Sequence, residues 1–129
     1  MEKIVIADTD VVIDFFSGSF PFAVAVADLI KKDRLAVTAI TVYELYAGIL
    51  GAKRLRQIEA FVENIPVMPL GTVEAAWAGR IYTELKSQGK MIGNQDILIA
   101  GICLANSLPF LTRNAAHFES IKGLEIIRI

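Results

Sequence analysis

Residues 4–16 read Ile-Val-Ile-Ala-Asp-Thr-Asp-Val-Val-Ile-Asp-Phe-Phe, and the rest of the chain can be placed around them. An apolar run with β-branched members leads directly into Asp8, after which the apolar residues change spacing around Asp10 and Asp14. This pattern predicts a buried strand that runs into a helix. In an open parallel sheet the ligand crevice lies outside the carboxyl ends of the strands. Asp8 is therefore the first functional candidate, and its structural alternative is a helix cap that accepts a backbone N–H.

Length and composition favour one domain, residues 1–129. The formal net charge of −1 argues against a global field for nucleic acid or an anionic membrane, so any RNA contact has to be local. A single cysteine, Cys103, cannot form an internal disulfide and suits the cytoplasm. No signal-peptide core or run of about 18 apolar residues is present, so we expect a soluble protein without a membrane partner. The 54% of apolar residues suits a sheet covered on both faces and a surface for a protein partner.

Strand and helix patterns alternate along the chain. We expect a loop at residues 15–22, strands at residues 35–39, 65–70, 109–112 and 124–129, helices at residues 23–32, 42–51, 52–64 and 72–87, a helix that Asn94 opens, and a turn or short helix at residues 113–119. Two prolines limit residues 65–70, which predicts a peripheral strand. Residues 97–105 are apolar on nearly every side, which predicts a central, buried helix. This order predicts an α/β domain with a mainly parallel sheet.

Four polar residues recur where strands end or helices begin: Asp8, Glu44, Asp96 and Asn114. Each also has a structural explanation. Glu44 completes a capping box with Thr41, and Asn114 caps a turn. The negative charge of Asp96 interacts favourably with the positive N-terminal end of the helix dipole. Asp96 is the strongest candidate of these three, because an acid that leads an apolar helix must reach solvent or a partner.

A convergence of Asp8, Glu44 and Asp96 would require a counter-charge. Two carboxylates about 4 Å apart repel by roughly 4 kcal/mol at an effective dielectric near 20. Such a cluster needs a cation, or one member must hold a proton. Oxygen-only ligands point to a hard ion, Mg²⁺ or Mn²⁺. A water activated by such an ion attacks phosphodiesters, so the chemistry implied is metal-dependent phosphodiester hydrolysis.

Four stretches in this order resemble the PIN-domain family, and within it the VapC-type toxins of toxin–antitoxin pairs. They are Ile-Val-Ile-Ala-Asp8-Thr-Asp10-Val-Val-Ile-Asp14, Ala-Ile-Thr-Val-Tyr-Glu44-Leu-Tyr-Ala-Gly48, Gly93-Asn-Gln-Asp96-Ile-Leu-Ile-Ala100 and Leu111-Thr-Arg-Asn114-Ala-Ala-His-Phe118. The resemblance implies a Rossmann-like α/β/α sandwich with a mainly parallel sheet of about five strands. It further implies a Mg²⁺-dependent ribonuclease, a homodimer, and a cognate antitoxin that occludes the active site.

The resemblance also assigns roles to individual residues. Asp8, Glu44 and Asp96 take the positions of the acidic triad, with Asp8 and Asp96 as metal ligands. Glu44 would help to bind the metal or orient the attacking water. Asn114 matches a fourth position that is often an acid, and this departure puts a tightly held second metal in doubt. Thr112 resembles the hydroxyl that positions Asp8 or a metal-bound water, and Asp10 occupies a position where the family often has Asn and would orient the turn.

Several residues have two interpretations. The lone His117 suits a turn or packing role as well as a substrate contact, and Asp14 is expected outside the metal shell. The basic residues Lys53, Arg54 and Arg56 suit a solvated helix face or contacts with RNA phosphate. The core is the first interpretation for Phe15, Phe16, Phe20 and Phe22. The alternative is that a few of them, together with Tyr43 and Tyr46, form a dimer or antitoxin groove.

Two competing functions differ from the ribonuclease. Asp8-Thr-Asp10-Val resembles the nucleophile motif of haloacid dehalogenase-like phosphatases, but the residues after Asn114 do not supply that family's later Lys and acidic pair in order. A receiver-type phosphoacceptor domain is excluded because the strand that ends at Leu70 has no Asp at its end. The other alternative is a PIN-like module that binds RNA or a protein without cutting, and the three retained carboxylates argue against it.

Overall fold

A five-stranded parallel sheet forms the centre of the computed structural model, which describes residues 2–129. The strand order is β3-β2-β1-β4-β5, and each neighbouring pair is parallel. The strands are β1 (Val5–Ala7), β2 (Leu35–Thr38), β3 (Val67–Met68), β4 (Phe110–Leu111) and β5 (Ile126–Ile127). The parallel α/β sheet predicted from the sequence is confirmed. The peripheral position of β3 is confirmed too, since it is an edge strand.

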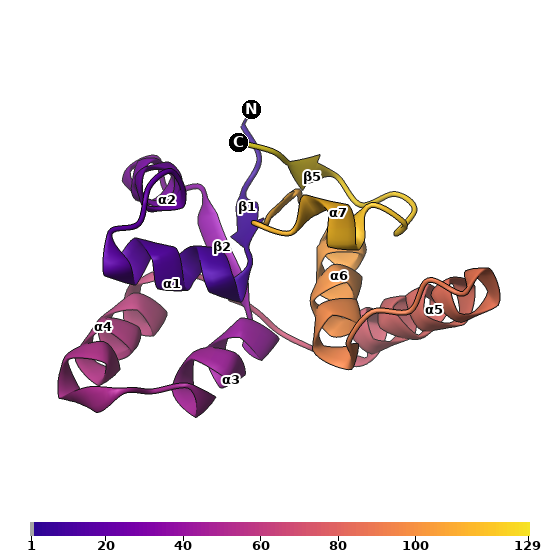
Figure 1. The fold of residues 1–129 in the computed structure, drawn as a ribbon, viewed down its shortest axis with the longest axis horizontal. Coiled ribbons are helices and arrows are strands. Elements are labelled where there is room, and N and C mark those ends of the chain that lie inside the picture. Colours follow the sequence, from indigo (N-terminus) through magenta and orange to yellow (C-terminus); the bar gives the residue numbers. More distant parts are fainter. Residues whose placement is uncertain (1) are drawn as a thin grey trace.

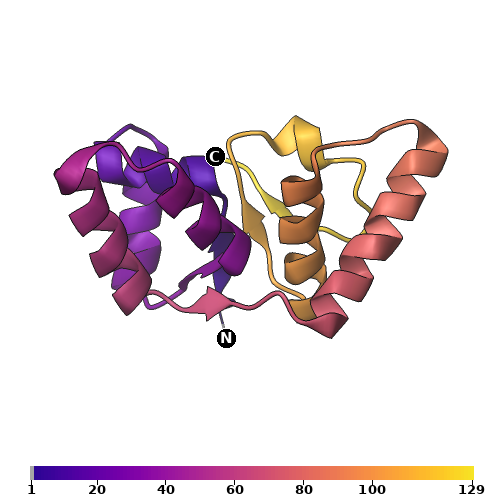
Figure 2. The ribbon, with the colours of Figure 1, turned by 90° about the horizontal axis from the view of Figure 1, so that it is seen from below.

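Helices cover both faces of the sheet (Figures 1 and 2). On one side lie α1 (Thr9–Ser17), α2 (Phe22–Lys31), α3 (Ala39–Ala47) and α4 (Gly51–Asn64). On the other lie α5 (Thr72–Gln88), α6 (Asn94–Asn106) and α7 (Ala115–Phe118). Helix α5 is the outermost, and it packs against α6. The result is the α/β/α sandwich that the family resemblance implies.

The apolar run at the start of the chain serves both layers. Val5 and Ala7 pack into the core beneath α1 to α4, whereas Ile6 packs into the core beneath α5 to α7. All three residues are buried, with no more than 1% of their surface exposed. Burial on both faces explains why β1 reads as a continuous apolar run instead of an alternating one.

Helix α3 begins earlier than the sequence pattern indicates. Its N-cap is Thr38, whose hydroxyl accepts a hydrogen bond from the backbone N–H of Thr41 at 3.2 Å. The predicted capping box between Thr41 and Glu44 is therefore wrong. The helix starts three residues sooner because β2 passes into α3 without a loop, and it ends at Ala47 instead of near residue 51, with Gly48 as its C-cap.

Other element ends differ by a few residues. Helix α1 continues to Ser17 and stops at Gly18, which has a left-handed φ of 70°, so the predicted loop at residues 15–22 is shorter. Helix α5 has Gly71 as its N-cap instead of Thr72, and the Glu74 carboxylate accepts a hydrogen bond from the Gly71 N–H at 2.8 Å. The strands β3, β4 and β5 are two residues each, because only these residues pair along the sheet.

Within residues 2–129, no helix alone has the length and apolar character needed to cross a membrane. Helices α1 and α2 pass that test only as a pair, and their axes meet at 94°.

Candidate active site

Asp8 lies at the carboxyl end of β1 and is buried, with 7% of its surface exposed. Its Oδ1 accepts a hydrogen bond from the backbone N–H of Thr9 at 2.8 Å, so Asp8 is also the N-cap of α1. Its Oδ2 accepts a hydrogen bond from the hydroxyl of Thr112 at 2.8 Å. Thr112 follows β4, the neighbour of β1, so the two strands deliver these side chains to the same edge of the sheet. The expected contact between Thr112 and Asp8 is present.

Burial changes the proton affinity of Asp8. Desolvation of the carboxylate raises the pKa of Asp8 from 3.8 to about 6, and the hydrogen bonds from Thr112 and Thr9 offset part of that rise. The negative charges of Asp96 and Asp10 add smaller increases. Asp8 and Asp96 are thus electrostatically coupled although they are far apart along the chain. A cation beside Asp8 would favour its ionised form.

Glu44 reaches the same region from α3. Its Oε1 accepts a hydrogen bond of 2.7 Å from the hydroxyl of Thr9, the residue whose backbone N–H binds Asp8. The Thr9 hydroxyl also lies 2.9 Å from the hydroxyl of Thr41. Asp8 and Glu44 are therefore joined through one residue, which the sequence reasoning did not identify. The sequence feature that could have indicated Thr9 is a hydroxyl side chain directly after Asp8, in a helix whose next residues are mostly apolar.

Asp96 stands in the first turn of α6, where its side chain is 33% exposed. Its Oδ2 lies 3.0 Å from Nε2 of His117, and the His117 ring packs edge-on against Phe118. The expectation that Asp96 reaches solvent or a partner is confirmed, because it does both. His117 has the predicted packing contact and, in addition, a direct contact with a candidate metal ligand that the sequence did not reveal.

Asn114 is tied to the site through its backbone. Its N–H donates to the hydroxyl of Thr112 at 3.0 Å, and Asn114 occupies the N-cap position of α7 without a side-chain capping bond. The predicted neighbourhood is correct, whereas the predicted cap by its side chain is wrong. Between Thr112 and Asn114, the Arg113 guanidinium forms an ion pair with Asp14 at 2.8 Å. Asp14 is therefore engaged by a cation of the chain itself, as expected for a residue outside a metal shell.

The candidate metal ligands are two carboxylates, those of Asp8 and Asp96, and not a group of three. Within residues 2–129, no three His, Cys, Asp or Glu side chains gather closely enough to enclose a metal. The expectation that three carboxylates form one compact cluster is thus wrong; Glu44 is joined to Asp8 through Thr9 instead. The coupled pair Asp8 and Asp96 fits Mg²⁺, which usually keeps several waters and binds proteins through one or two carboxylates.

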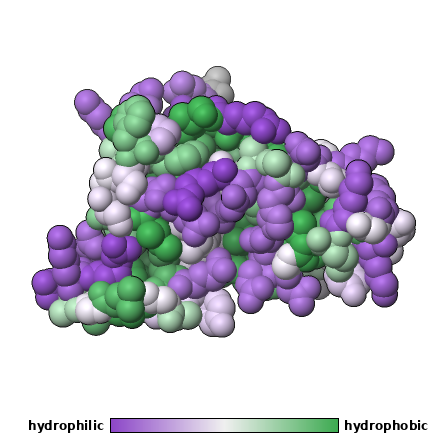
Figure 3. All heavy atoms as spheres, viewed as in Figure 1, coloured by the Kyte–Doolittle hydropathy of each residue, from purple (hydrophilic) through white to green (hydrophobic). Residues whose placement is uncertain are grey.

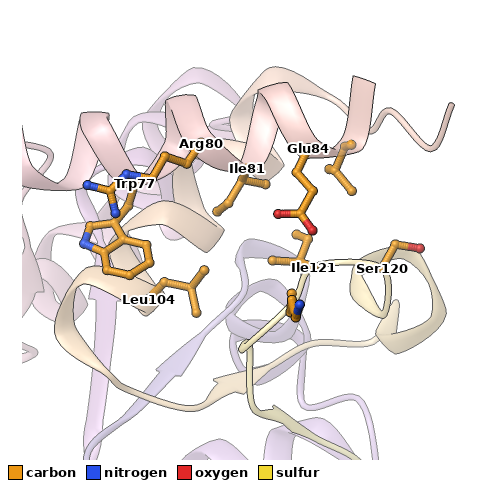
Figure 4. A pocket seen from close by; sticks show the side chains of 9 residues that line it. Trp77, Arg80, Ile81, Glu84, Leu104, Ser120 and Ile121 are labelled. Atoms are coloured by element: carbon orange, nitrogen blue, oxygen red, sulfur yellow. The ribbon is translucent and has the colours of Figure 1, made fainter. Parts of the chain in front are cut away.

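A pocket of about 180 Å³ lies elsewhere, between α5, α6 and the segment that follows α7 (Figure 4). The Arg80 guanidinium lies 4.8 Å from the centre of the Trp77 ring there, with Leu104 below this pair and Ile121 below Glu84. None of the candidate acids lines this pocket. The proposed chemistry therefore belongs to the edge of the sheet at the end of β1, not to this pocket.

Comparisons with known proteins agree with this arrangement. The chain is 31% identical to Ribonuclease VapC1 of Haemophilus influenzae strain R2866 over 124 residues, which cover 92% of both chains. It is 30% identical to the tRNA(fMet)-specific endonuclease VapC of Shigella flexneri over 99 residues, 74% of this chain and 75% of that protein. The crystal structure of DNA-bound VapBC from Salmonella typhimurium superposes with a TM-score of 0.86, at 26% identity and 98% coverage of both chains.

The profile of the PIN domain matches residues 5–124, which include every candidate site residue. This match contradicts the alternative of a haloacid dehalogenase-like phosphatase. The chain belongs to the PIN-domain family.

Proposed function

We propose that this protein is a Mg²⁺-dependent endoribonuclease and the toxin of a toxin–antitoxin pair. The observation that carries the proposal is the buried carboxylate of Asp8, coupled to Asp96 at the carboxyl end of a parallel strand. A desolvated acid beside a second acid is the environment that a hard cation relieves. Relatives named as ribonuclease and endonuclease support RNA as the substrate.

Each site residue has a role in this proposal. Asp8 and Asp96 would hold Mg²⁺, with Mn²⁺ as a substitute, and the ion supplies an activated water and neutralises the charge that develops on the phosphate. Thr112 and the Thr9 N–H keep both oxygens of Asp8 in place. Glu44 has one oxygen bound to Thr9, and we assign its other oxygen to a metal-bound water, which Glu44 would orient for attack and through which it would add to the affinity for the metal. The Asn114 amide is assigned to the substrate or to a water, in place of a fourth carboxylate.

The antitoxin and a second copy of the chain are the protein partners that we propose. Large apolar side chains are exposed on α3 and after it: Tyr43 is 62% exposed, Tyr46 40% and Leu50 86%. Figure 3 shows hydrophobic side chains gathered at the connection between α3 and α4. Phe15, Phe16, Phe20 and Phe22 lie on and beside the first two helices, and Phe20 is 83% exposed. Exposed apolar area of this kind is typical of surfaces that a partner covers.

Among the basic residues of α4, Lys53, Arg54 and Arg56, Arg54 has contacts with α1. The Arg54 guanidinium lies 5.3 Å above the Phe16 ring and donates to the Ser17 hydroxyl at 3.2 Å. Arg54 thus packs against α1 instead of lying free on a solvated face, and its contact with RNA phosphate stays a prediction, as does that of Lys53. We also infer a cytoplasmic location, which suits an RNA substrate and the single, buried Cys103.

The proposal is tested by incubating the purified protein with total tRNA, in Mg²⁺ and in EDTA. We expect cleavage in Mg²⁺ and none in EDTA, and we expect Asp8→Asn and Asp96→Asn to lower the rate by at least about 10³-fold. The exposed acid Asp28 provides the matched control, Asp28→Asn, which should cut at the wild-type rate. Wild-type activity in EDTA, or in Asp96→Asn, would overturn the assignment.

The non-cleaving alternative gives a different result in the same experiment. A binding module would retain tRNA in a gel-shift assay and leave it intact in Mg²⁺. The three retained carboxylates favour cleavage, since a site that only binds RNA has no use for carboxylates that repel phosphate.

A further inference from the structure

Thr9 makes more polar contacts with the candidate site than its neighbours in α1 do. It is the first residue of α1 and is buried, with 9% of its surface exposed. Its backbone N–H donates to Oδ1 of Asp8 at 2.8 Å, and its hydroxyl donates to Oε1 of Glu44 at 2.7 Å. One residue thereby connects an acid at the end of β1 with an acid on α3 that lies 35 positions after Thr9 in the chain.

The direction of these hydrogen bonds follows from the chemistry of the groups. An ionised carboxylate only accepts, and a hydroxyl has one proton to donate. The Thr9 proton is therefore used on Glu44, and the 2.9 Å contact with Thr41 must have the Thr41 hydroxyl as its donor. Protons thus point from Thr41 to Thr9 and from Thr9 to Glu44. The Thr9 hydroxyl therefore has no proton left to donate to another group.

The backbone around Thr9 makes this arrangement rigid. The Thr41 N–H donates to the hydroxyl of Thr38, the N-cap of α3, so Thr41 lies in the capped first turn of α3, and the hydroxyls of Thr9 and Thr41 join this turn to the start of α1. Glu44 has a long side chain with several rotatable bonds, and half-buried acids of this kind are mobile unless a donor holds them. The hydrogen bond from the Thr9 hydroxyl to Oε1 limits that freedom.

We propose that Thr9 is a positioning residue, whose hydroxyl holds the Glu44 carboxylate in place for the metal-dependent reaction at Asp8. This inference rests on the proposed ribonuclease function and adds to it the residue on which the orientation of Glu44 depends. Thr9 touches neither substrate nor metal in this account and acts through Glu44 alone.

The test compares Thr9→Val with Thr9→Ser. Valine has nearly the shape of threonine without the hydroxyl, and serine keeps the hydroxyl. We expect Thr9→Val to lower kcat for tRNA cleavage about 10- to 100-fold while KM changes less than about threefold, because substrate binding does not use this hydroxyl. Thr9→Ser should recover the rate to within about threefold of wild type. Thr83→Val, which removes an exposed hydroxyl on α5, is the matched control and should change nothing.

A second measurement does not depend on catalysis. Electron paramagnetic resonance of free Mn²⁺ gives the Mn²⁺ affinity of each variant, and far-ultraviolet circular dichroism checks that each one is folded. We expect Thr9→Val to weaken Mn²⁺ binding several-fold and Thr9→Ser to restore it, since Glu44 then regains its fixed orientation.

The outcomes separate this inference from the function on which it rests. A wild-type protein that does not cut RNA would contradict the ribonuclease proposal, and the Mn²⁺ affinities would still test Thr9. Wild-type kcat and Mn²⁺ affinity in Thr9→Val would overturn the positioning role. Equal losses in Thr9→Ser and Thr9→Val would also overturn it, because the loss would then follow packing and not the hydroxyl.

Discussion

At the residue scale, ionising the buried carboxyl group of Asp8 costs free energy. Both its oxygens accept hydrogen bonds, yet burial still keeps the pKa near 6 instead of 3.8. The folded protein therefore binds this proton more tightly than the unfolded chain does. The stability that this proton provides is present below about pH 4 and is lost as the pH rises through 6. Above that pH, the ionised carboxylate lowers the free energy of unfolding of the metal-free protein by roughly 3 kcal/mol.

Asp8→Asn should consequently stabilise the metal-free protein. We expect the free energy of unfolding in EDTA to rise by up to about 3 kcal/mol at pH 8 and by about half as much at pH 5, because the wild-type acid is then largely protonated. Urea denaturation at the two pH values measures both changes. Asp28→Asn, at an exposed acid paired with Lys32, should shift stability by less than about 0.5 kcal/mol. A destabilised Asp8→Asn at pH 8 would show that the burial cost is misassigned.

At the element scale, the contact between α5 and α6 sets the position of Asp96. Gly101, in the middle of α6, approaches α5 so closely that an added Cβ would lie 2.8 Å from the backbone nitrogen and the Cβ of Ala78. Backbone atoms on both helices cannot move aside as a flexible side chain does. The small residue is therefore required by the helix crossing, and a shift of α6 would carry Asp96 with it.

Gly101→Ala should destabilise the protein in spite of alanine's better helix propensity. We expect a loss of about 1 to 3 kcal/mol, since the two helices have to separate to admit the methyl group. Gly79→Ala, on α5 with open space around it, is the matched control and should gain up to about 1 kcal/mol. Thermal unfolding followed by circular dichroism measures both variants. Stabilisation by both substitutions would contradict the close crossing.

The sequence predicted which elements form better than it predicted how their ends are bonded. Apolar runs and helical spacing belong to one segment at a time, so β1, the edge strand β3 and the buried helix α6 were predictable. The cap of α3 was not, because Thr38 and Thr41 both precede suitable helical residues, and the choice depends on where β2 stops pairing. Because α3 starts earlier than predicted, Thr41 lies inside the helix, and its hydroxyl contacts the Thr9 hydroxyl instead of capping α3.

At the scale of the whole molecule, residues from three separate regions of the chain meet at one edge of the sheet. The strand order places β1 between β2 and β4, so the segments that follow these three strands lie together. Asp8 and Glu44 were predictable there from a strand end and a helix start, and Thr112 from the family resemblance. The link through Thr9 and the contact of His117 with Asp96 were not, because they depend on how the side chains are oriented in the folded chain. Apart from this edge, Tyr43, Tyr46 and Leu50 leave apolar surface exposed on and after α3.

The homodimer prediction concerns this apolar surface. Light scattering after size exclusion should give twice the 14.1 kDa of one chain. Replacing Tyr43 and Leu50 together by Lys should yield a folded monomer, because charged groups cannot be buried unpaired between two copies. Ser87→Lys, at an exposed polar position on α5, should stay dimeric. A wild-type monomer at micromolar concentration, or a dimer of the double variant, would contradict the prediction.

The claim on which the account depends is that Asp8 and Asp96 share one hard divalent ion. Crystals soaked in Mn²⁺ test it directly, because the anomalous difference map marks the ion independently of any assay. We predict one strong peak per chain, in contact with carboxylate oxygens of both residues, and loss of this peak in Asp8→Asn. A peak bound by other acids, or a peak that persists at full height in Asp8→Asn, would contradict the account.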